Sequence, residues 1–248
     1  MRKVLIIFIL SVGTLFVGFA QTIKDTTIKA PVFTISYAGQ APMGDLSERF
    51  GINSNLGFSA GYKTASNWLF ELQGSFLFSQ NIKEDSLLAP LAGSDGFIVN
   101  SEGNHAFIEL YQRGFTGSFD VGRIFPWFGP NLNSGMVFKA GIGFMQHKIR
   151  IQNENNLVPL LTGESIKFWD RYTLGVMTKQ YIGYHHMANT NLANFTFGIE
   201  LMQGFTRGMR DYQIDLEGPY RDNRFDMLFG IRFGWIVPVY RRAPNMSS

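Results

Sequence analysis

The stretch from Phe225 to Tyr240 alternates between apolar residues and residues that are mostly small or charged. Successive side chains of a strand point to opposite faces, so one face of this segment is wholly apolar and the other carries Asp226, Arg232 and glycines. The apolar face comprises Phe225, Met227, Phe229, Ile231, Phe233, Trp235, Val237 and Val239. A tilted strand needs about 9–11 residues to cross the hydrocarbon of a membrane. The segment is long enough, and we predict that it spans a membrane with its apolar face toward lipid.

Seven further segments repeat the two-residue period, which fits strands better than helices. They are residues 31–40, 55–63, 68–79, 107–125, 135–147, 172–185 and 194–206. Together with residues 225–240 they predict an all-β fold, an eight-stranded antiparallel up-and-down transmembrane β-barrel. In 107–125 the alternation loses its phase before Gly114, and we expect a β-bulge there.

Short and long connections alternate between these segments. The short ones, 64–67, 126–134 and 187–193, hold turn residues such as Gly129-Pro130-Asn131 and Asn189-Thr190-Asn191. The long ones are 41–54, 80–105, 152–170 and 207–224. Outer-membrane barrels have short periplasmic turns and longer extracellular loops, so the four long segments are predicted to be extracellular.

Residues 1–20 have the form of a secretory signal peptide. Arg2 and Lys3 precede an apolar stretch that ends in the small-x-small site Gly18-Phe19-Ala20. A transmembrane anchor is the alternative, but the apolar core is short for one. The chain has no cysteine, which excludes a lipoprotein anchor and disulfides. We expect cleavage of the signal peptide, a single barrel domain over residues 21–248, and location in the outer membrane of a Gram-negative cell.

The last strand also carries a pattern typical of substrates of the barrel-assembly machinery. A polar residue and a glycine are followed by two hydrophobic residues at alternate positions, here Arg232, Gly234, Val237 and Val239. The pattern is loose by itself. Combined with the signal peptide and the alternation, it predicts that the assembly machinery inserts this chain.

Seven charged residues are predicted to face the lumen. They are Glu71, Asp120, Lys139, Lys179, Glu200, Asp226 and Arg232. A buried charge is costly unless it is paired, and the interior of an eight-stranded barrel is just filled by side chains. We therefore expect a nearly neutral network that plugs the lumen, with an ion pathway as the alternative.

The sequence gives no support for catalytic, cofactor-binding or metal-binding residues. The four histidines are His105, His147, His185 and His186. The last two are expected at the periplasmic end and cannot share a site with His147. A His105–His147 pair stays open. Ser101 and Glu102 are near His105 in the sequence, but no nucleophile-elbow or Ser-x-x-Lys motif accompanies these two residues. Zinc-ligand spacings and phosphate-cradling loops do not occur either.

Two long segments are candidates for partner contacts. The segment 207–224 is rich in charges that could meet lipopolysaccharide phosphates or a protein, although a solvated loop with its own ion pairs is more common. The segment 80–105 holds apolar residues that a lone loop would bury, which makes it the better candidate. The predicted contact residues are Phe97, Ile98, Arg207, Arg210, Arg221 and Arg224. Without its signal peptide the chain is almost neutral, so nucleic acid is not an expected partner.

Three parts of the chain resemble the small outer-membrane β-barrel proteins of Bacteroidota. They are the Gly44–Gly51 segment, the hairpin from Tyr62 to Trp68, and the end from Gly234 to Arg242. The resemblance implies a fold and a location and carries over no catalytic residue. Some proteins of this kind are similar to accessory subunits of larger outer-membrane machines. The polar end from Ala243 to Ser248 departs from the pattern, because it lacks an aromatic finish.

These observations predict a non-enzymatic integral outer-membrane protein. We expect a structural role or an accessory place in an outer-membrane complex, with the extracellular loops as the contact surface. The expected partners are membrane lipid and lipopolysaccharide, the barrel-assembly machinery and other outer-membrane proteins, and no cofactor is expected. The alternatives are a lipid-modifying or proteolytic barrel enzyme, which would need a His–acid–Ser cluster at one rim, and a narrow channel.

Overall fold

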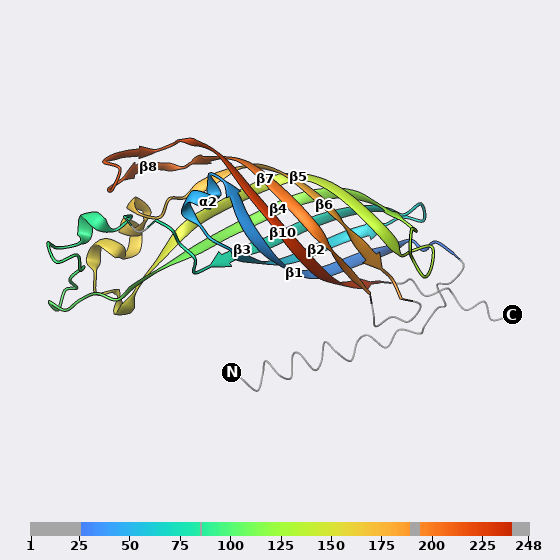
Figure 1. The fold of residues 1–248 in the computed structure, drawn as a ribbon, viewed down its shortest axis with the longest axis horizontal. Coiled ribbons are helices and arrows are strands. Elements are labelled where there is room, and N and C mark those ends of the chain that lie inside the picture. Colours follow the sequence, from blue (N-terminus) through green and yellow to red (C-terminus); the bar gives the residue numbers. More distant parts are fainter. Residues whose placement is uncertain (1–25, 85, 189–193, 240–248) are drawn as a thin grey trace, which may run out of the picture.

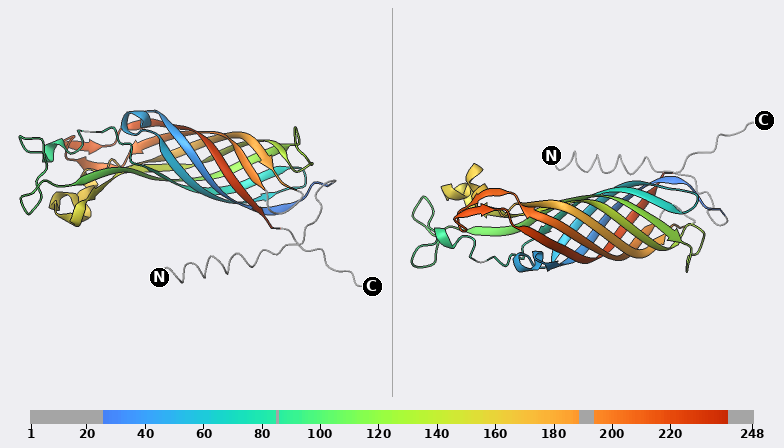
Figure 2. Two further views of the ribbon diagram at one scale, coloured as in Figure 1. Left: turned by 60° about the horizontal axis from the view of Figure 1, so that its bottom comes forward. Right: turned by 90° about the horizontal axis from the view of Figure 1, so that it is seen from above.

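Eight long strands close into a barrel that runs along the longest axis of the molecule (Figures 1 and 2). The structure is a computed structural model and describes residues 26–84, 86–188 and 194–239. The barrel strands are β1 (Ala30–Gly44), β2 (Asn53–Lys63), β3 (Trp68–Ser79), β4 (Ile108–Phe125), β5 (Gly135–Asn153), β6 (Thr173–His186), β7 (Phe195–Gly208) and β10 (Asn223–Pro238). The predicted signal peptide, residues 1–20, and the predicted turn Asn189-Thr190-Asn191 lie outside the described residues.

The strands follow one another around the ring, and each pairs with its neighbours in antiparallel fashion. The order is β1-β10-β7-β6-β5-β4-β3-β2, and β1 closes the ring by pairing with β10 from Val32↔Pro238 to Gly44↔Asp226. A closed ring leaves no strand edge with unpaired backbone groups. The predicted eight-stranded antiparallel barrel is thus confirmed.

The two ends of the barrel differ in their connections. At one end, named here the turn end, the links 64–67 and 126–134 are short. At the other, the loop end, longer links carry a short helix α2 (Leu46–Arg49), a hairpin of β8 (Arg210–Gln213) and β9 (Gly218–Tyr220), and short 3-10 helices. The 3-10 helices are η1 (Ala89–Leu91), η2 (Glu154–Asn156), η3 (Pro159–Leu161) and η4 (Gly163–Phe168). None of the helices in the described part of the chain is long and apolar enough to span a membrane.

Exposure alternates along the strands as the sequence pattern requires. In β10 the side chains of Phe229, Ile231 and Phe233 are about half exposed, whereas Leu228 and Asp226 are completely buried. The same alternation places an apolar belt on the outside of the other strands. It includes Phe33, Ile35, Tyr37, Leu56, Phe58, Phe70, Leu72, Phe115, Phe119, Ile142, Phe144, Phe197 and Ile199. Exposure of such an apolar belt to water is unfavourable, whereas contact with the hydrocarbon of a membrane is favourable.

Strands β4 and β5 extend far beyond the loop end of their neighbours. Their pairing runs in constant register from Ile108↔Asn153 to Phe125↔Met136, so the expected bulge before Gly114 is wrong. The polarity of the two faces inverts instead. In the extension, Ile108 and Ile149 point inward, while Arg113 and other charged residues point outward. The inversion marks the level at which the apolar belt ends and water begins on the outside.

The chain turns sharply from β1 into α2 at Gly44. Its φ of +60° is a left-handed conformation that favours glycine, and a Cβ there would lie 2.4 Å from the carbonyl oxygen of Phe225. The turn is held by Asp45, whose carboxylate accepts a hydrogen bond from the Phe225 amide at 2.7 Å. As a consequence, Leu46 and Phe50 enter the barrel mouth, where both are completely buried.

Candidate functional site

The interior of the barrel is crossed by hydrogen-bonded ion pairs. Arg232 of β10 donates to both carboxylate oxygens of Glu200 on β7, at 2.6 and 2.7 Å. Its Nη1 donates to Ser36 Oγ of β1 at 2.7 Å, and Nη2, which also binds Glu200, donates to Asn55 Oδ1 of β2 at 2.9 Å. Gln40 Nε2 completes the shell by donating to Glu200 Oε1 at 2.7 Å. One guanidinium therefore joins β10 to three other strands.

Two further ion pairs lie beside this one. Lys179 Nζ lies 2.6 Å from Asp120 Oδ2 and also donates to Gln73, and Lys139 is paired with Glu71. With Arg232 and Glu200, the structure brings together six of the seven predicted lumen charges in three neutral pairs. Removing one member of a buried pair leaves a charge without compensation, at a cost of about 3–5 kcal/mol.

The seventh charge, Asp226, lies apart from these pairs, nearer the loop end. Its Oδ2 accepts hydrogen bonds from His147 Nε2 at 2.8 Å and from Thr206 Oγ1 at 2.5 Å, and Arg224 lies 3.4 Å from Oδ1. The His147 ring meets Phe50 edge-on. Sequence reasoning missed Thr206 and Arg224 as lumen residues. The Thr206 hydroxyl, which a catalytic triad would place on the histidine, donates to the carboxylate instead, so the group lacks the nucleophile–base–acid order.

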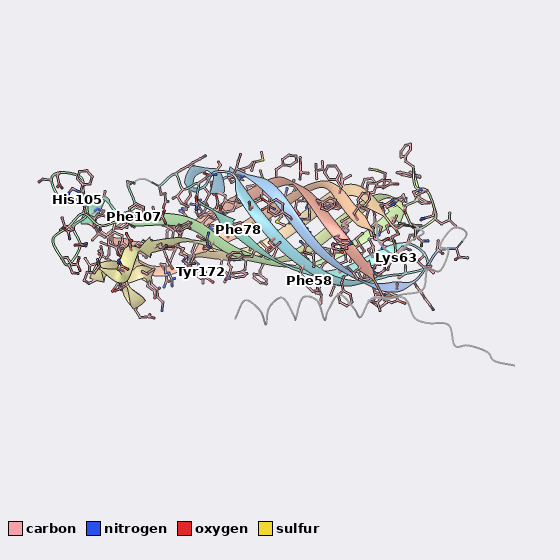
Figure 3. All side chains as sticks on the ribbon, turned by 90° about the horizontal axis from the view of Figure 1, so that it is seen from below. Phe58, Lys63, Phe78, His105, Phe107 and Tyr172 are labelled. Atoms are coloured by element: carbon pink, nitrogen blue, oxygen red, sulfur yellow. The ribbon has the colours of Figure 1, made fainter. Side chains whose placement is uncertain are left out.

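The turn end of the lumen is closed by buried polar side chains and a small apolar cluster. Lys63 Nζ donates to the Ile28 carbonyl and to Asn133 Oδ1, both at 2.9 Å (Lys63 is labelled in Figure 3). The adjoining apolar cluster consists of Val32, Leu69, Ile124, Val137, Tyr181 and Ile236.

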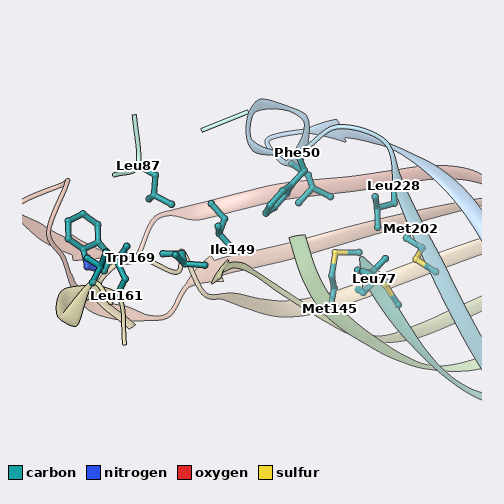
Figure 4. Packing of buried hydrophobic residues seen from close by; sticks show 13 residues of the cluster. Phe50, Leu77, Leu87, Met145, Ile149, Leu161, Trp169, Met202 and Leu228 are labelled. Atoms are coloured by element: carbon teal, nitrogen blue, oxygen red, sulfur yellow. The ribbon is translucent and has the colours of Figure 1, made fainter. Parts of the chain in front are cut away.

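The loop end is closed by a larger apolar cluster that continues out of the barrel (Figure 4). Within the barrel it includes Leu77, Met145 and Met202 from the inward faces of the strands. Beyond the barrel it reaches Trp169, which is completely buried among the loops. The cluster makes the loops a packed cap. Its signal in the sequence is the inverted polarity of residues 107–113, where inward Ile108 and Leu110 replace the polar lumen residues.

Between the ion pairs, a cavity of about 20 Å³ is lined by Ser36, Gln73, Lys139, Lys179 and Arg232, among others. About one water molecule fits into such a space. The described lumen thus holds ion pairs in the middle and packed side chains at both ends, which leaves ions no wide aqueous path.

Ion pairs also join the loops of the cap. The Glu84 carboxylate forms ion pairs with two arginines: Oε1 lies 2.8 Å from Arg49 Nε, and Oε2 lies 3.3 Å from Arg171 Nε. Arg171 is also paired with Asp215. Both guanidinium groups lie over the ring of Tyr220. Glu84 therefore links the α2 segment to the segment before β6. These residues are far apart in the sequence, and no motif singles them out.

The predicted contact residues lie in different environments. Phe97 is about half exposed and stacks on His105, whereas Ile98 packs against the apolar cluster of the cap. Arg207 donates to the carbonyl of Arg221, and Arg221 pairs with Asp211 in the open.

Arg210 and Arg224 are less available than the sequence indicates. Arg210 forms an ion pair with Asp170, and this hydrogen bond raises the pKa of Arg210 above its usual value, so that the pair stays charged. Arg224 lies on β10 rather than in a loop, with its side chain 11% exposed beside Asp226 and donating to the Asp45 carbonyl.

A group of basic side chains lies on the outside of β4, β5 and β7, beyond the apolar belt at the loop end. Arg113 of β4 is paired in register with Lys148 of β5, and Arg150 follows two residues further along the same face. Arg207 of β7 lies outward at the corresponding end of its strand. We name Arg113, Lys148, Arg150 and Arg207 the basic rim. Sequence reasoning missed the first three, which follow from the same polarity inversion.

The histidines do not converge on one site. His105 is on the loop that carries Phe97, and His147 is bound to Asp226. His185 is buried near the turn end, and His186 stacks between Tyr184 and Phe195. Within residues 26–84, 86–188 and 194–239, no group of three or more His, Cys, Asp or Glu side chains could hold a metal ion.

The predicted insertion pattern runs from Arg232, in the middle of β10, to Val239, just beyond the turn end of the strand. Val237 pairs with Phe33 of β1, and Val239, directly after the strand, donates its amide to the Pro31 carbonyl at 2.9 Å. A Cβ on Gly234 would lie 2.8 Å from Thr34 and 2.9 Å from Thr196, so its place in the pattern coincides with close packing inside the lumen.

No protein-family profile matches the chain, and no curated protein sequence matches it. Among solved structures, it is similar to Ail, the attachment invasion locus protein of Yersinia pestis, in complex with the heparin analogue sucrose octasulfate, at 9% identity and a TM-score of 0.46. The match covers 84% of this chain and 98% of Ail. Neisserial surface protein A matches at 12% identity and a TM-score of 0.40, over 86% and 99% of the chains. The N-terminal β-barrel domain of Pseudomonas aeruginosa OprF matches at 12% identity and a TM-score of 0.38, over 84% and 99%.

Proposed function

We propose that this chain is a non-enzymatic integral outer-membrane protein with a closed lumen, which presents its loop-end cap as a contact surface for another outer-membrane protein. The observation that carries the proposal is the combination of an apolar outer belt with a lumen filled by paired charges. The belt requires hydrocarbon around the barrel. The filled lumen leaves the outer surface and the cap as the places where the protein can act.

The outer membrane is the proposed location because closed barrels span membranes without exposing unpaired backbone. In this proposal residues 1–20 direct export and are removed, and the Arg232–Val239 pattern serves the barrel-assembly machinery. The loop end faces the outside of the cell. The basic rim then lies at the level of lipopolysaccharide phosphates, which lysine and arginine bind well. The resemblance to barrels of Bacteroidota is part of the same proposal.

The cap suits an accessory subunit. Its core and its ion pairs hold the loops in one arrangement, so little conformational freedom is lost when a partner binds. At its tip, Phe97, Val99 and Phe107 are each more than half exposed, and His105 and Phe107 mark this tip in Figure 3. Exposed apolar side chains on an ordered loop are typical of protein contact sites.

The location is tested by fractionation. The mature protein is expected with outer membranes, to migrate heat-modifiably on gels, and to give a β-rich circular dichroism spectrum. Recovery from the soluble periplasm would contradict the location.

The contact role is tested by purification in mild detergent and identification of stably bound proteins. The double variant Phe97→Asp and Val99→Asp is expected to lose such a partner and to keep the heat-modifiable barrel. The control is Phe128→Asp at the turn end, where the side chain is 90% exposed. If the native protein, the double variant and the control recover the partner equally, the tip is not part of the contact surface.

A further inference from the structure

Three polar side chains lie in the middle of the apolar belt, on the outer faces of β6 and β7. They are Thr178, Gln180 and Gln203, named here the β6–β7 polar patch. Thr178 Oγ1 donates to Gln203 Oε1 at 3.0 Å, and Gln180 Nε2 donates to the same oxygen at 3.4 Å. Gln180 is the central outward position of β6, with three outward positions on either side before the strand ends.

This depth is unusual for polar groups. The charged residues on the outside of the barrel lie towards the strand ends, as with Arg123 beside Trp68 and Arg113 in the basic rim. There they can reach water or lipid headgroups. A carboxamide at the middle of the belt can reach neither, so hydrocarbon leaves any free donor or acceptor unsatisfied.

The patch satisfies only part of its hydrogen-bonding capacity. Gln203 Oε1 is used twice, but among the described residues nothing accepts a hydrogen bond from Gln203 Nε2. Gln180 Oε1 is also without a partner. Rotation of the Gln180 amide exposes this buried oxygen in exchange for the 3.4 Å hydrogen bond from Gln180 Nε2 to Gln203 Oε1. One spare donor and one spare acceptor then lie side by side on neighbouring strands.

The outward neighbours of the patch differ between its two sides. On β5 and β6 they are the short or β-branched residues Ala140, Ile142, Val176 and Ile182. On β7 and β10 they are the longer residues Leu201, Phe205 and Met227. Because the neighbours on β5 and β6 are short or β-branched, a second barrel can approach the side-chain amides from that side.

We propose that the β6–β7 polar patch is the centre of a two-fold interface between two copies of this chain in the membrane. A two-fold axis along the membrane normal keeps each residue at its own depth and brings the patch opposite its own image. The spare donor of Gln203 in each copy then meets the spare acceptor of Gln180 in the other. A second copy supplies both groups at the right depth, whereas lipid chains supply neither. This interface is independent of the contact role proposed for the cap.

The test uses disulfide cross-linking, because the chain has no cysteine of its own. A single Leu201→Cys substitution places a thiol beside both glutamines. The control is Leu72→Cys on β3, which lies opposite β7 in the ring and is also in the apolar belt. In oxidised outer membranes we expect a disulfide-linked dimer from Leu201→Cys and none from Leu72→Cys.

The decisive step adds Gln180→Leu and Gln203→Leu to Leu201→Cys. Leucine suits lipid, so the barrel is expected to remain heat-modifiable while the dimer is lost. If the double exchange does not fold, Gln203→Leu alone decides. The interface is overturned if Leu201→Cys gives no dimer, if Leu72→Cys gives as much, or if the dimer survives the glutamine exchanges. An adduct with a protein of different mass would exclude the second copy as the partner.

Discussion

Arg232 on β10 and Glu200 on β7 form a two-pronged ion pair across the inside of the barrel, with N···O distances of 2.6 and 2.7 Å. The side chains of both residues are at most 5% exposed. The guanidinium also donates hydrogen bonds to Ser36 from Nη1 and to Asn55 from Nη2. Such a pair fixes which strands lie beside one another more than it adds to the net free energy of folding.

Replacing Arg232 by Met is expected to lower the free energy of unfolding by about 3–5 kcal/mol, because it leaves Glu200 buried without a cation. Denaturant titration of the heat-modifiable band measures this change. The double variant with Glu200→Gln is the control and should recover part of the loss, since the orphaned charge is removed. Neither variant should raise the conductance of planar bilayers. A stable Arg232→Met protein with a large new conductance would favour the channel alternative.

Arginine substitutions along the outer face of β10 should report membrane depth. The series Met227, Phe229, Ile231, Phe233 and Trp235 crosses the apolar belt. The penalty is expected to reach about 2–4 kcal/mol near Phe229 and Ile231 and to fall toward Trp235, as arginine reaches the interface. Refolding titrations into lipid vesicles measure each value. A flat profile would contradict the assignment of this face to lipid.

The cap should loosen when Glu84 is replaced by Gln. The change leaves Arg49 and Arg171 with weaker partners, at a cost of about 1–3 kcal/mol. Limited proteolysis should then cut the loops faster while the barrel remains heat-modifiable. Glu164→Gln is the matched control, because its ion pair with Lys167 is solvent-exposed and its loss should leave the digestion rate unchanged. Equal rates for all proteins would mean that Glu84 does not hold the cap.

The basic rim should govern lipopolysaccharide retention. Substituting Arg113, Lys148 and Arg150 together by Ala is expected to reduce the lipopolysaccharide that copurifies and to weaken the salt dependence of its binding. Lys167→Ala is the control, because Lys167 is an exposed basic residue of the cap that lies outside the rim and pairs with Glu164, so its loss should leave retention unchanged. Unchanged retention in the triple variant would contradict a role for the rim.

The strands were readable from the sequence because one physical requirement, lipid outside and polar groups inside, acts at every second residue. The segment 172–185 gave a weaker signal because Thr178 and Gln180 interrupt its apolar face, and the structure shows that they face outward in register. At residues 107–113 the surroundings of β4 change from lipid to water. The outward face of the strand therefore becomes polar and its inward face apolar. In the sequence alone, this reversal looks like the loss of phase that a β-bulge would cause.

The partners of the charged residues inside the lumen were harder to predict from the sequence. Inward charges follow from the alternation, but their partners depend on how far each strand is shifted around the ring. The Asp226–His147 contact and the Glu84 bridge join residues 79 and 35 or more positions apart. Arg224 appeared to belong to a loop because the beginning of β10 could not be separated from the charged stretch before it.

The position of Arg232 has a consequence for assembly. Glu200 belongs to β7, which pairs with β10 directly, whereas Ser36 and Asn55 belong to β1 and β2, which Arg232 meets only in the closed ring. Before closure the guanidinium can already pair with Glu200, but two of its acceptors are missing. A ring closed in a shifted register would leave these hydrogen bonds in the lumen unmade. The correct register is therefore expected to be favoured by hydrogen bonds inside the lumen as well as by the backbone pairing of β1 with β10.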